Sequence, residues 1–184
     1  MKTKKMVLTA FFVALGMVLP FLTGQIPQIG KALSPLHLPA LMAGFILGAP
    51  LGALVGFVLP LLRSAVFGMP IMFPMAVAMA FELATYGFVS GLAYKLLKKM
   101  QSNLKGDAAR LIQILLALIA AMLCGRVAYG AVNWLLLTIN NESYTFALFI
   151  SGTITNAIPG ILLQLVLIPT LIFSLEKAKI VSVK

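Results

Sequence analysis

Three ionisable side chains, Arg63, Glu82 and Arg126, lie inside long apolar runs of this chain. A charge at the centre of a bilayer costs about 2.5 to 3.5 kcal/mol on insertion scales, so each of them is a candidate functional group. One carboxylate cannot neutralise two guanidinium groups. The excess positive charge favours an anionic guest that carries a carboxylate or a phosphate.

Each of these charges also has a structural interpretation. Arg63 precedes Gly68 by five residues, a depth of roughly 7 Å at the helical rise, so its long stem can snorkel to the membrane surface. Glu82 and Arg126 lie deeper and at similar levels, so they can pair with each other across two helices. In that case Glu82 neutralises Arg126, and Arg63 is the arginine least expected to have a partner in the protein. Arg63 is therefore a candidate anchor for an anion.

Other polar side chains recur on single helical faces. Tyr129 and Asn133 follow Arg126 at i+3 and i+7, and Tyr86 follows Glu82 at i+4. A third stripe comprises Thr153, Asn156, Gly160 and Gln164. Such stripes form interhelical hydrogen bonds or line a site for a small polar molecule, and their clustering towards one side of the membrane favours a site.

The only histidine, His37, follows the Pro- and Gly-punctuated segment from Thr23 to Pro35, and a second such segment runs from Gly68 to Pro74. Partly apolar loops of this kind can close over a pocket. His37 is therefore a candidate contact to a substrate or gate, with a helix start or an interface role as the alternative. No second His, Cys or acid lies near it in the sequence, so we expect no metal site and no cofactor.

The elements that position these residues follow from composition. With 61% hydrophobic and 10% charged residues, the chain is predicted to be an all-α integral membrane protein. We expect a single membrane domain, 1–184, with six transmembrane helices at about 6–22, 37–49, 51–67, 73–97, 111–138 and 144–175. The second and third helices are separated at Ala49-Pro50, because one helix of about 30 residues would measure about 45 Å, too long for a core of about 30 Å.

Basic residues then set the topology. An inside N-terminus and six crossings place these on the cytoplasmic side: Lys2, Lys4, Lys5, Lys95, Lys98, Lys99, Lys105, Arg110, Lys177, Lys179 and Lys184. Only Lys31 falls outside, so both termini are predicted to be cytoplasmic. The basic residues form no stripe with interleaved aromatics, so no nucleic-acid partner is expected.

Small residues recur at every fourth position through Ala40, Gly44, Gly48, Gly52 and Gly56. In lipid such a groove permits close helix packing, with a sliding or partner surface as the alternative. The first helix carries a second pair, Ala10-x-x-x-Ala14.

These features together resemble a substrate-binding S component of an energy-coupling factor (ECF) vitamin transporter, over nearly the full chain. The resemblance rests on the Ala10-x-x-x-Ala14 motif, the segment LSPLHLPALMAGFILGAPLGALVGFVLPLLRS and six spans in a chain near this size. The long segment is typical of the riboflavin and pantothenate branch. The resemblance implies a multi-pass protein of the bacterial cell membrane that captures a vitamin from outside, between the outer halves of helices four to six and under external loops.

The resemblance also implies partners. They are a membrane-embedded coupling subunit, faced by Ala10 and Ala14, and two cytoplasmic ATPase subunits. The chain has no G-x-x-x-x-G-K-[ST] loop of its own. On docking to this module the S component is expected to topple within the membrane.

The substrate is predicted from the excess arginine and from a difference between this sequence and riboflavin-binding relatives. Riboflavin-binding relatives show an acidic or Lys/Asn-bearing stretch where this chain has PLHLPAL and PLLRSAVFGMP. Pantothenate therefore ranks first, then a phosphorylated or pyridine-type (pyridoxine-like) vitamin, then riboflavin. The predicted substrate contacts are Arg63, Glu82, Tyr86, Arg126, Tyr129, Asn133, Asn156 and His37.

Two other classes of protein compete with this one. An intramembrane enzyme would need paired catalytic groups at one depth. One histidine and one acid within the spans do not supply them, so no catalytic residues are expected. A structural or assembly subunit would need the helix packing but no polar pocket.

Overall fold

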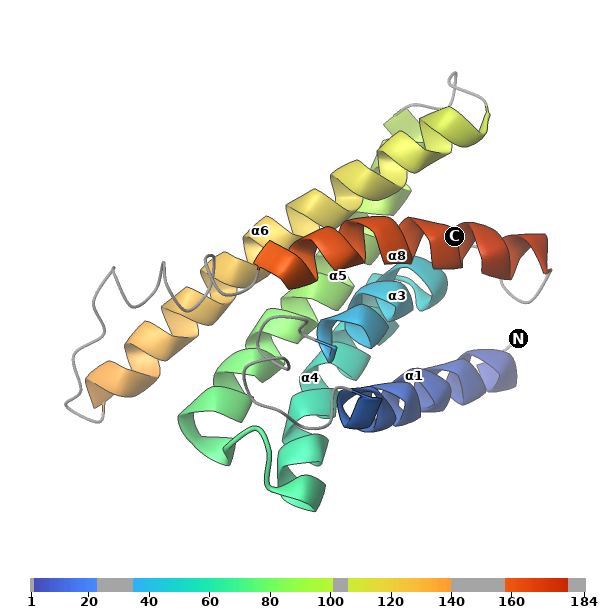
Figure 1. The fold of residues 1–184 in the computed structure, drawn as a ribbon. Coiled ribbons are helices and arrows are strands. Elements are labelled where there is room, and N and C mark those ends of the chain that lie inside the picture. The colour runs from blue at the N-terminus through green and yellow to red at the C-terminus, as the bar shows by residue number, and fades with distance from the viewer. Residues whose placement is uncertain (1, 23–34, 101–105, 140–157, 179–184) are drawn as a thin grey trace.

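The computed structural model describes residues 2–22, 35–100, 106–139 and 158–178. Every regular element among these residues is a helix (Figure 1), which confirms the predicted all-α class. The elements are α1 (Lys2–Leu22), α3 (His37–Leu47), α4 (Ala49–Phe67), the π-helical turn η1 (Met72–Ala76), α5 (Val77–Met100), α6 (Asp107–Ile139) and α8 (Ile158–Lys177).

Five of the described helical segments are long and apolar enough to cross a bilayer, counting η1 and α5 as one. The protein is therefore a multi-pass integral membrane protein. The remaining helix, α3, has 11 residues and extends about 16 Å, about half of a bilayer core. The predicted second span is thus present as a helix too short to cross alone. Of the predicted last helix, 144–157 lies outside the described residues.

The break between α3 and α4 falls at Gly48, one residue before the predicted site. Gly48 has a φ of 92°, a conformation that glycine adopts without steric cost. Pro50 stands in the first turn of α4, where its missing N–H would have no helical partner in any case. The prediction of two helices is confirmed, but Pro50 begins the second helix rather than ending the first.

Backbones of α3, α4 and α5 pack directly against one another. A Cβ placed on Gly52 would lie 2.6 Å from the Gly44 Cα and 2.6 Å from the Gly87 carbonyl oxygen, and one on Gly91 would lie 2.6 Å from the Gly44 carbonyl oxygen. No side chain fits at such distances. Gly44, Gly52 and Gly56 of the predicted series therefore serve close packing, whereas Gly48 forms the break between the two helices. α3 lies at the centre with all its residues buried.

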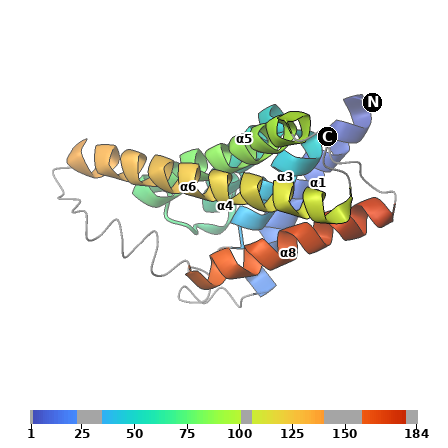
Figure 2. The same ribbon diagram turned by 90° about the horizontal axis from the view of Figure 1, so that it is seen from above.

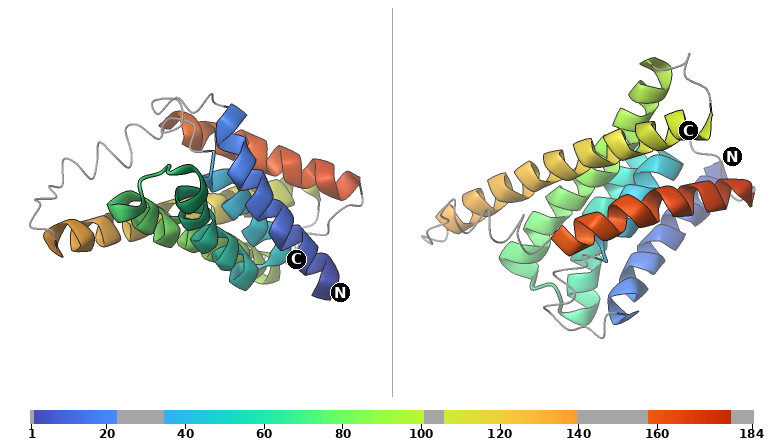
Figure 3. Two further views of the ribbon diagram at one scale, coloured as in Figure 1. Left: turned by 90° about the horizontal axis from the view of Figure 1, so that it is seen from below. Right: turned by 45° about the horizontal axis from the view of Figure 1, so that its top comes forward.

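The other helices surround this core. α5 packs between α4 and α6, α1 covers α3 and α4, and α8 contacts α6 and α3 (Figure 2). The start of α1, the start of α6 and the end of α8 lie at one end of the bundle (Figure 3), here called the proximal end. The opposite end, where α4 and α6 finish, is the distal end. That the proximal end faces the cytoplasm stays a prediction from its basic residues.

Candidate functional site

A buried carboxylate, Glu82, lies in the distal part of α5 and is 2% exposed. Its Oε1 accepts a hydrogen bond from the Tyr86 hydroxyl at 2.9 Å and lies 3.1 Å from Nη1 of Arg126 on α6. A buried carboxylate needs such partners, because removal from water is costly without them. The predicted pairing of Glu82 with Arg126 is confirmed.

His37, the first residue of α3, lies beside this pair. Its Nε2 is 3.7 Å from Oε2 of Glu82, and its ring packs edge to face on Tyr86 with centroids 5.1 Å apart. An acid that is distant in the sequence therefore lies beside His37 in the structure. The cause is the shortness of α3, which begins at the level of Glu82 instead of at the membrane surface. We call His37, Glu82, Tyr86 and Arg126 the Glu82 cluster.

Gly125, which the sequence did not single out, makes the close approach of α6 possible. A Cβ at this position would collide with the ring of Tyr86. Glycine here lets the ring of Tyr86 lie against the α6 backbone, beside the residue that carries the guanidinium. The only signal in the sequence is the position of Gly125 directly before Arg126.

Two buried nitrogen atoms of the cluster have no hydrogen-bond partner among the described residues. They are Nδ1 of His37 and Nε of Arg126. Arg126 Nε can only donate, whereas His37 Nδ1 donates or accepts according to its tautomer. Buried polar atoms in native proteins nearly always have a partner, so these two suit a polar guest group. The positive end of the α3 dipole lies at His37 and favours a negative group there.

The remaining polar stripes are buried at some of their positions. On α6, Asn133 is 5% exposed and its Nδ2 donates to the Tyr129 carbonyl oxygen at 3.1 Å. On α8, Gly160 and Gln164 are buried. Asn156, the predicted contact on this stripe, lies outside the described residues.

Arg63 belongs to a different set of contacts. It is 3% exposed, and its Nη1 donates to the Met17 carbonyl oxygen of α1 at 2.6 Å. Its guanidinium carbon lies 5.2 Å from the ring centroid of Phe21 and 5.1 Å from that of Phe67. Protein covers the group, so it does not snorkel, and the expectation of a weak protein partner is wrong. Its described contacts tie α1 to α4 and do not include the Glu82 cluster.

Ala10 and Ala14 are both exposed on α1. Neighbouring apolar side chains, among them Met6 (70% exposed) and Phe11 (55%), share this exposure. The motif therefore lies on a surface that is open to lipid or to another membrane protein.

The chain matches the family model described as "ECF transporter, substrate-specific component" over residues 4–172. No curated protein and no solved structure matches the chain. The matched range includes every residue of the Glu82 cluster, and the family is a class of transporter subunits that bind substrate, not a class of enzymes. Because the match spans nearly the whole sequence, the protein belongs to the substrate-specific components of ECF transporters.

Proposed function

We propose that this S component binds a water-soluble vitamin with a carboxylate, pantothenate before others, and delivers it through an ATP-driven coupling module. The observation that carries the proposal is the buried Nε of Arg126, which has no hydrogen-bond partner in the described part of the chain. In this proposal the distal end faces the outside of a bacterial cell, and the protein itself performs no catalysis.

The geometry suggests a division of roles within the cluster. Glu82 holds one Nη of Arg126, which fixes the planar guanidinium and leaves further N–H donors for a guest. A guanidinium presents five such donors in a rigid fork that suits a carboxylate. The Glu82 charge therefore positions the arginine, and the guest carboxylate binds the remaining side of the fork.

Neighbouring groups suit the rest of such a vitamin. His37 Nδ1 lies buried beside the arginine, and Tyr129 and Asn133 continue the polar face of α6 towards the distal end. Pantothenate carries an amide and hydroxyl groups besides its carboxylate, and these can pair with such side chains. Asn156 remains a proposed contact from the sequence.

The other vitamins rank lower on the same chemistry. A phosphorylated or pyridine-type vitamin offers an anionic or polar group for Arg126, whereas riboflavin has no carboxylate for it. Arg63 remains a proposed anion anchor from the charge count alone. Its described contacts to Met17, Phe21 and Phe67 support a structural role instead.

For partners, we propose that the Ala10 and Ala14 face of α1 contacts the membrane-embedded coupling subunit, which associates with two ATPase subunits. The exposure of both alanines supports this contact.

Isothermal titration calorimetry of the purified protein with each vitamin tests the proposal. Without ATP or coupling subunits, the protein should bind one molecule of pantothenate, and it should bind riboflavin more weakly. A flat titration across pantothenate, pyridoxine, its phosphate and riboflavin would remove the support for vitamin capture.

A further inference from the structure

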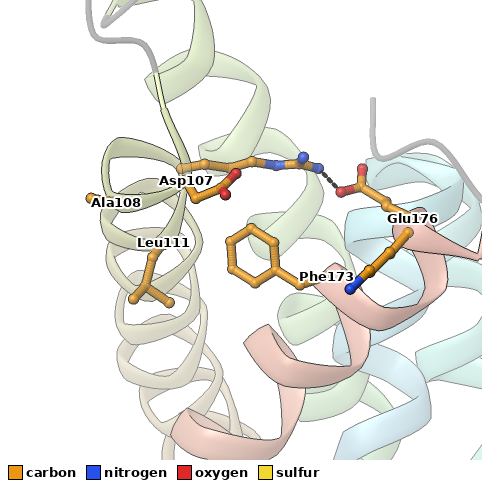
Figure 4. A pocket seen from close by; sticks show the side chains of 7 residues that line it. Asp107, Ala108, Leu111, Phe173 and Glu176 are labelled. Carbon is orange, nitrogen blue, oxygen red and sulfur yellow. Dashed lines mark ion pairs between the residues drawn. The ribbon is translucent and has the colours of Figure 1, made fainter.

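A cavity of about 640 Å³ opens at the proximal end, between the first turn of α6 and the last turns of α8 (Figure 4). It is lined by Asp107, Ala108, Arg110, Leu111, Phe173, Glu176 and Lys177. Arg110 precedes Arg126 by 16 residues on α6, a separation of about 24 Å along the helix. The groove is therefore distinct from the Glu82 cluster, and its volume lies within the range of small-molecule sites.

The two walls of the groove are joined by one ion pair. Arg110 of α6 pairs with Glu176 of α8, and the Arg110 guanidinium carbon lies 5.5 Å from the centroid of the Phe173 ring. In Figure 4 the Phe173 ring lies between the two helices, below this pair and facing the α6 wall that carries Leu111. The groove thus has an apolar interior and a charged rim.

Two rim charges remain after Arg110 and Glu176 neutralise each other. Asp107 on the α6 wall and Lys177 on the α8 wall are exposed, and neither has an ion pair within the part of the chain that the structure describes. They offer one negative and one positive group on opposite walls. This arrangement is complementary to a zwitterion with an apolar body.

We propose that this groove binds the headgroup of phosphatidylethanolamine from the membrane leaflet at the proximal end. The groove lies at the ends of two helices that are long and apolar enough to cross a bilayer. The ends of such helices lie at the level of the lipid headgroups. Lys177 binds the phosphate, Asp107 binds the ammonium, and Phe173 and Leu111 contact the glycerol and the first acyl carbons. The proposal is independent of the vitamin site.

The same chemistry predicts selectivity among phospholipids. A phosphatidylcholine headgroup has no N–H with which to donate a charge-assisted hydrogen bond to Asp107. A phosphatidylglycerol headgroup has a phosphate for Lys177 but no cation for Asp107. Phosphatidylethanolamine satisfies both rim charges.

Native mass spectrometry of the delipidated full-length protein tests this proposal, with the three lipids titrated separately at matched acyl chains. The wild type should bind phosphatidylethanolamine about tenfold more tightly than phosphatidylcholine, the effect of one charge-assisted hydrogen bond. Asp107→Asn should remove this preference, and Lys177→Gln should weaken binding of all three lipids. The charge swap Asp107→Lys with Lys177→Asp should restore the preference.

Lys99→Gln is the matched control, because Lys99 is an exposed lysine in the last turn of α5 and does not line the groove. It should leave lipid binding unchanged. Equal binding of the three lipids to the wild type, or an unchanged preference in Asp107→Asn, would overturn the proposal. Vitamin titrations of the same variants should match the wild type, so failure here and failure of the vitamin proposal are separable.

Discussion

Arg126 on α6 places its Nη1 3.1 Å from Oε1 of Glu82 on α5, while its Nε is buried with no partner among the described residues. Nη1 of the guanidinium is thus held by the protein, whereas the N–H at Nε has no described acceptor. A pair that served only to hold two helices together would gain from using all its donors, since unmade buried hydrogen bonds are costly. The relationship therefore suits a binding group that the protein has oriented in advance.

Arg126→Lys separates the charge from the fork. Lysine keeps a positive charge near Glu82 but replaces the planar fork by a single ammonium. We expect the affinity for pantothenate to fall by at least about tenfold, with the free energy of unfolding changed by no more than about 1 kcal/mol. Isothermal titration and thermal unfolding measure the two effects. Arg110→Lys, at the proximal end, is the matched control and should leave vitamin affinity unchanged. Wild-type affinity in Arg126→Lys would contradict binding of the vitamin carboxylate by the planar guanidinium.

A double-mutant cycle measures the buried pair itself. Removal of one partner leaves an uncompensated buried charge, so Glu82→Gln and Arg126→Gln should each reduce stability by about 3 to 5 kcal/mol. The double variant should lose much less than the sum of the two, because no unpaired charge remains. Chemical unfolding in detergent gives the free energies. Additive losses would mean that the two side chains are not coupled.

Arg63→Ala decides between the two roles of that arginine. The contacts to Met17, Phe21 and Phe67 predict a loss of thermal stability, because α1 loses its tie to α4, with pantothenate affinity changed by less than about threefold. Phe67→Leu removes one of the two rings and should cost about 1 kcal/mol, with vitamin affinity unchanged. If Arg63→Ala abolishes pantothenate binding and unfolds like the wild type, the structural role is contradicted and Arg63 anchors the anion, as the excess of arginine over acid predicted.

Ala10→Trp tests the exposed face of α1. The bulky ring should block close contact with a coupling subunit, so vitamin uptake by cells should be lost while the purified protein keeps its affinity. Val166→Trp is the control, since Val166 is 71% exposed on α8 and should tolerate the ring without loss of uptake. Loss of binding in Ala10→Trp would show that α1 serves the site rather than the partner.

The sequence predicted the parts of the structure that depend on local pattern. The length of the apolar runs predicted the helices. The spacing of Gly44, Gly52 and Gly56 predicted the close packing of α3 and α4 against α5. The similar depths of Glu82 and Arg126 along their helices indicated that the two side chains could pair. Each of these follows from position along a helix of known rise.

Contacts between distant segments were beyond such reasoning. His37 meets Glu82 because α3 is short and starts inside the bundle. Arg63 finds the Met17 carbonyl because α1 and α4 converge at the distal end. Pro20, which lacks a backbone N–H, weakens the hydrogen-bond ladder in that part of α1. Neither meeting has a periodic signal in the sequence.

The most direct test of the account is the identity of the small molecule that copurifies with the protein. Denaturation of the purified wild type should release a carboxylate-bearing vitamin, pantothenate, at about one molecule per chain, which mass spectrometry identifies. Arg126→Lys should release much less. Release of riboflavin in equal amounts from both proteins, or of no vitamin from either, would contradict the account.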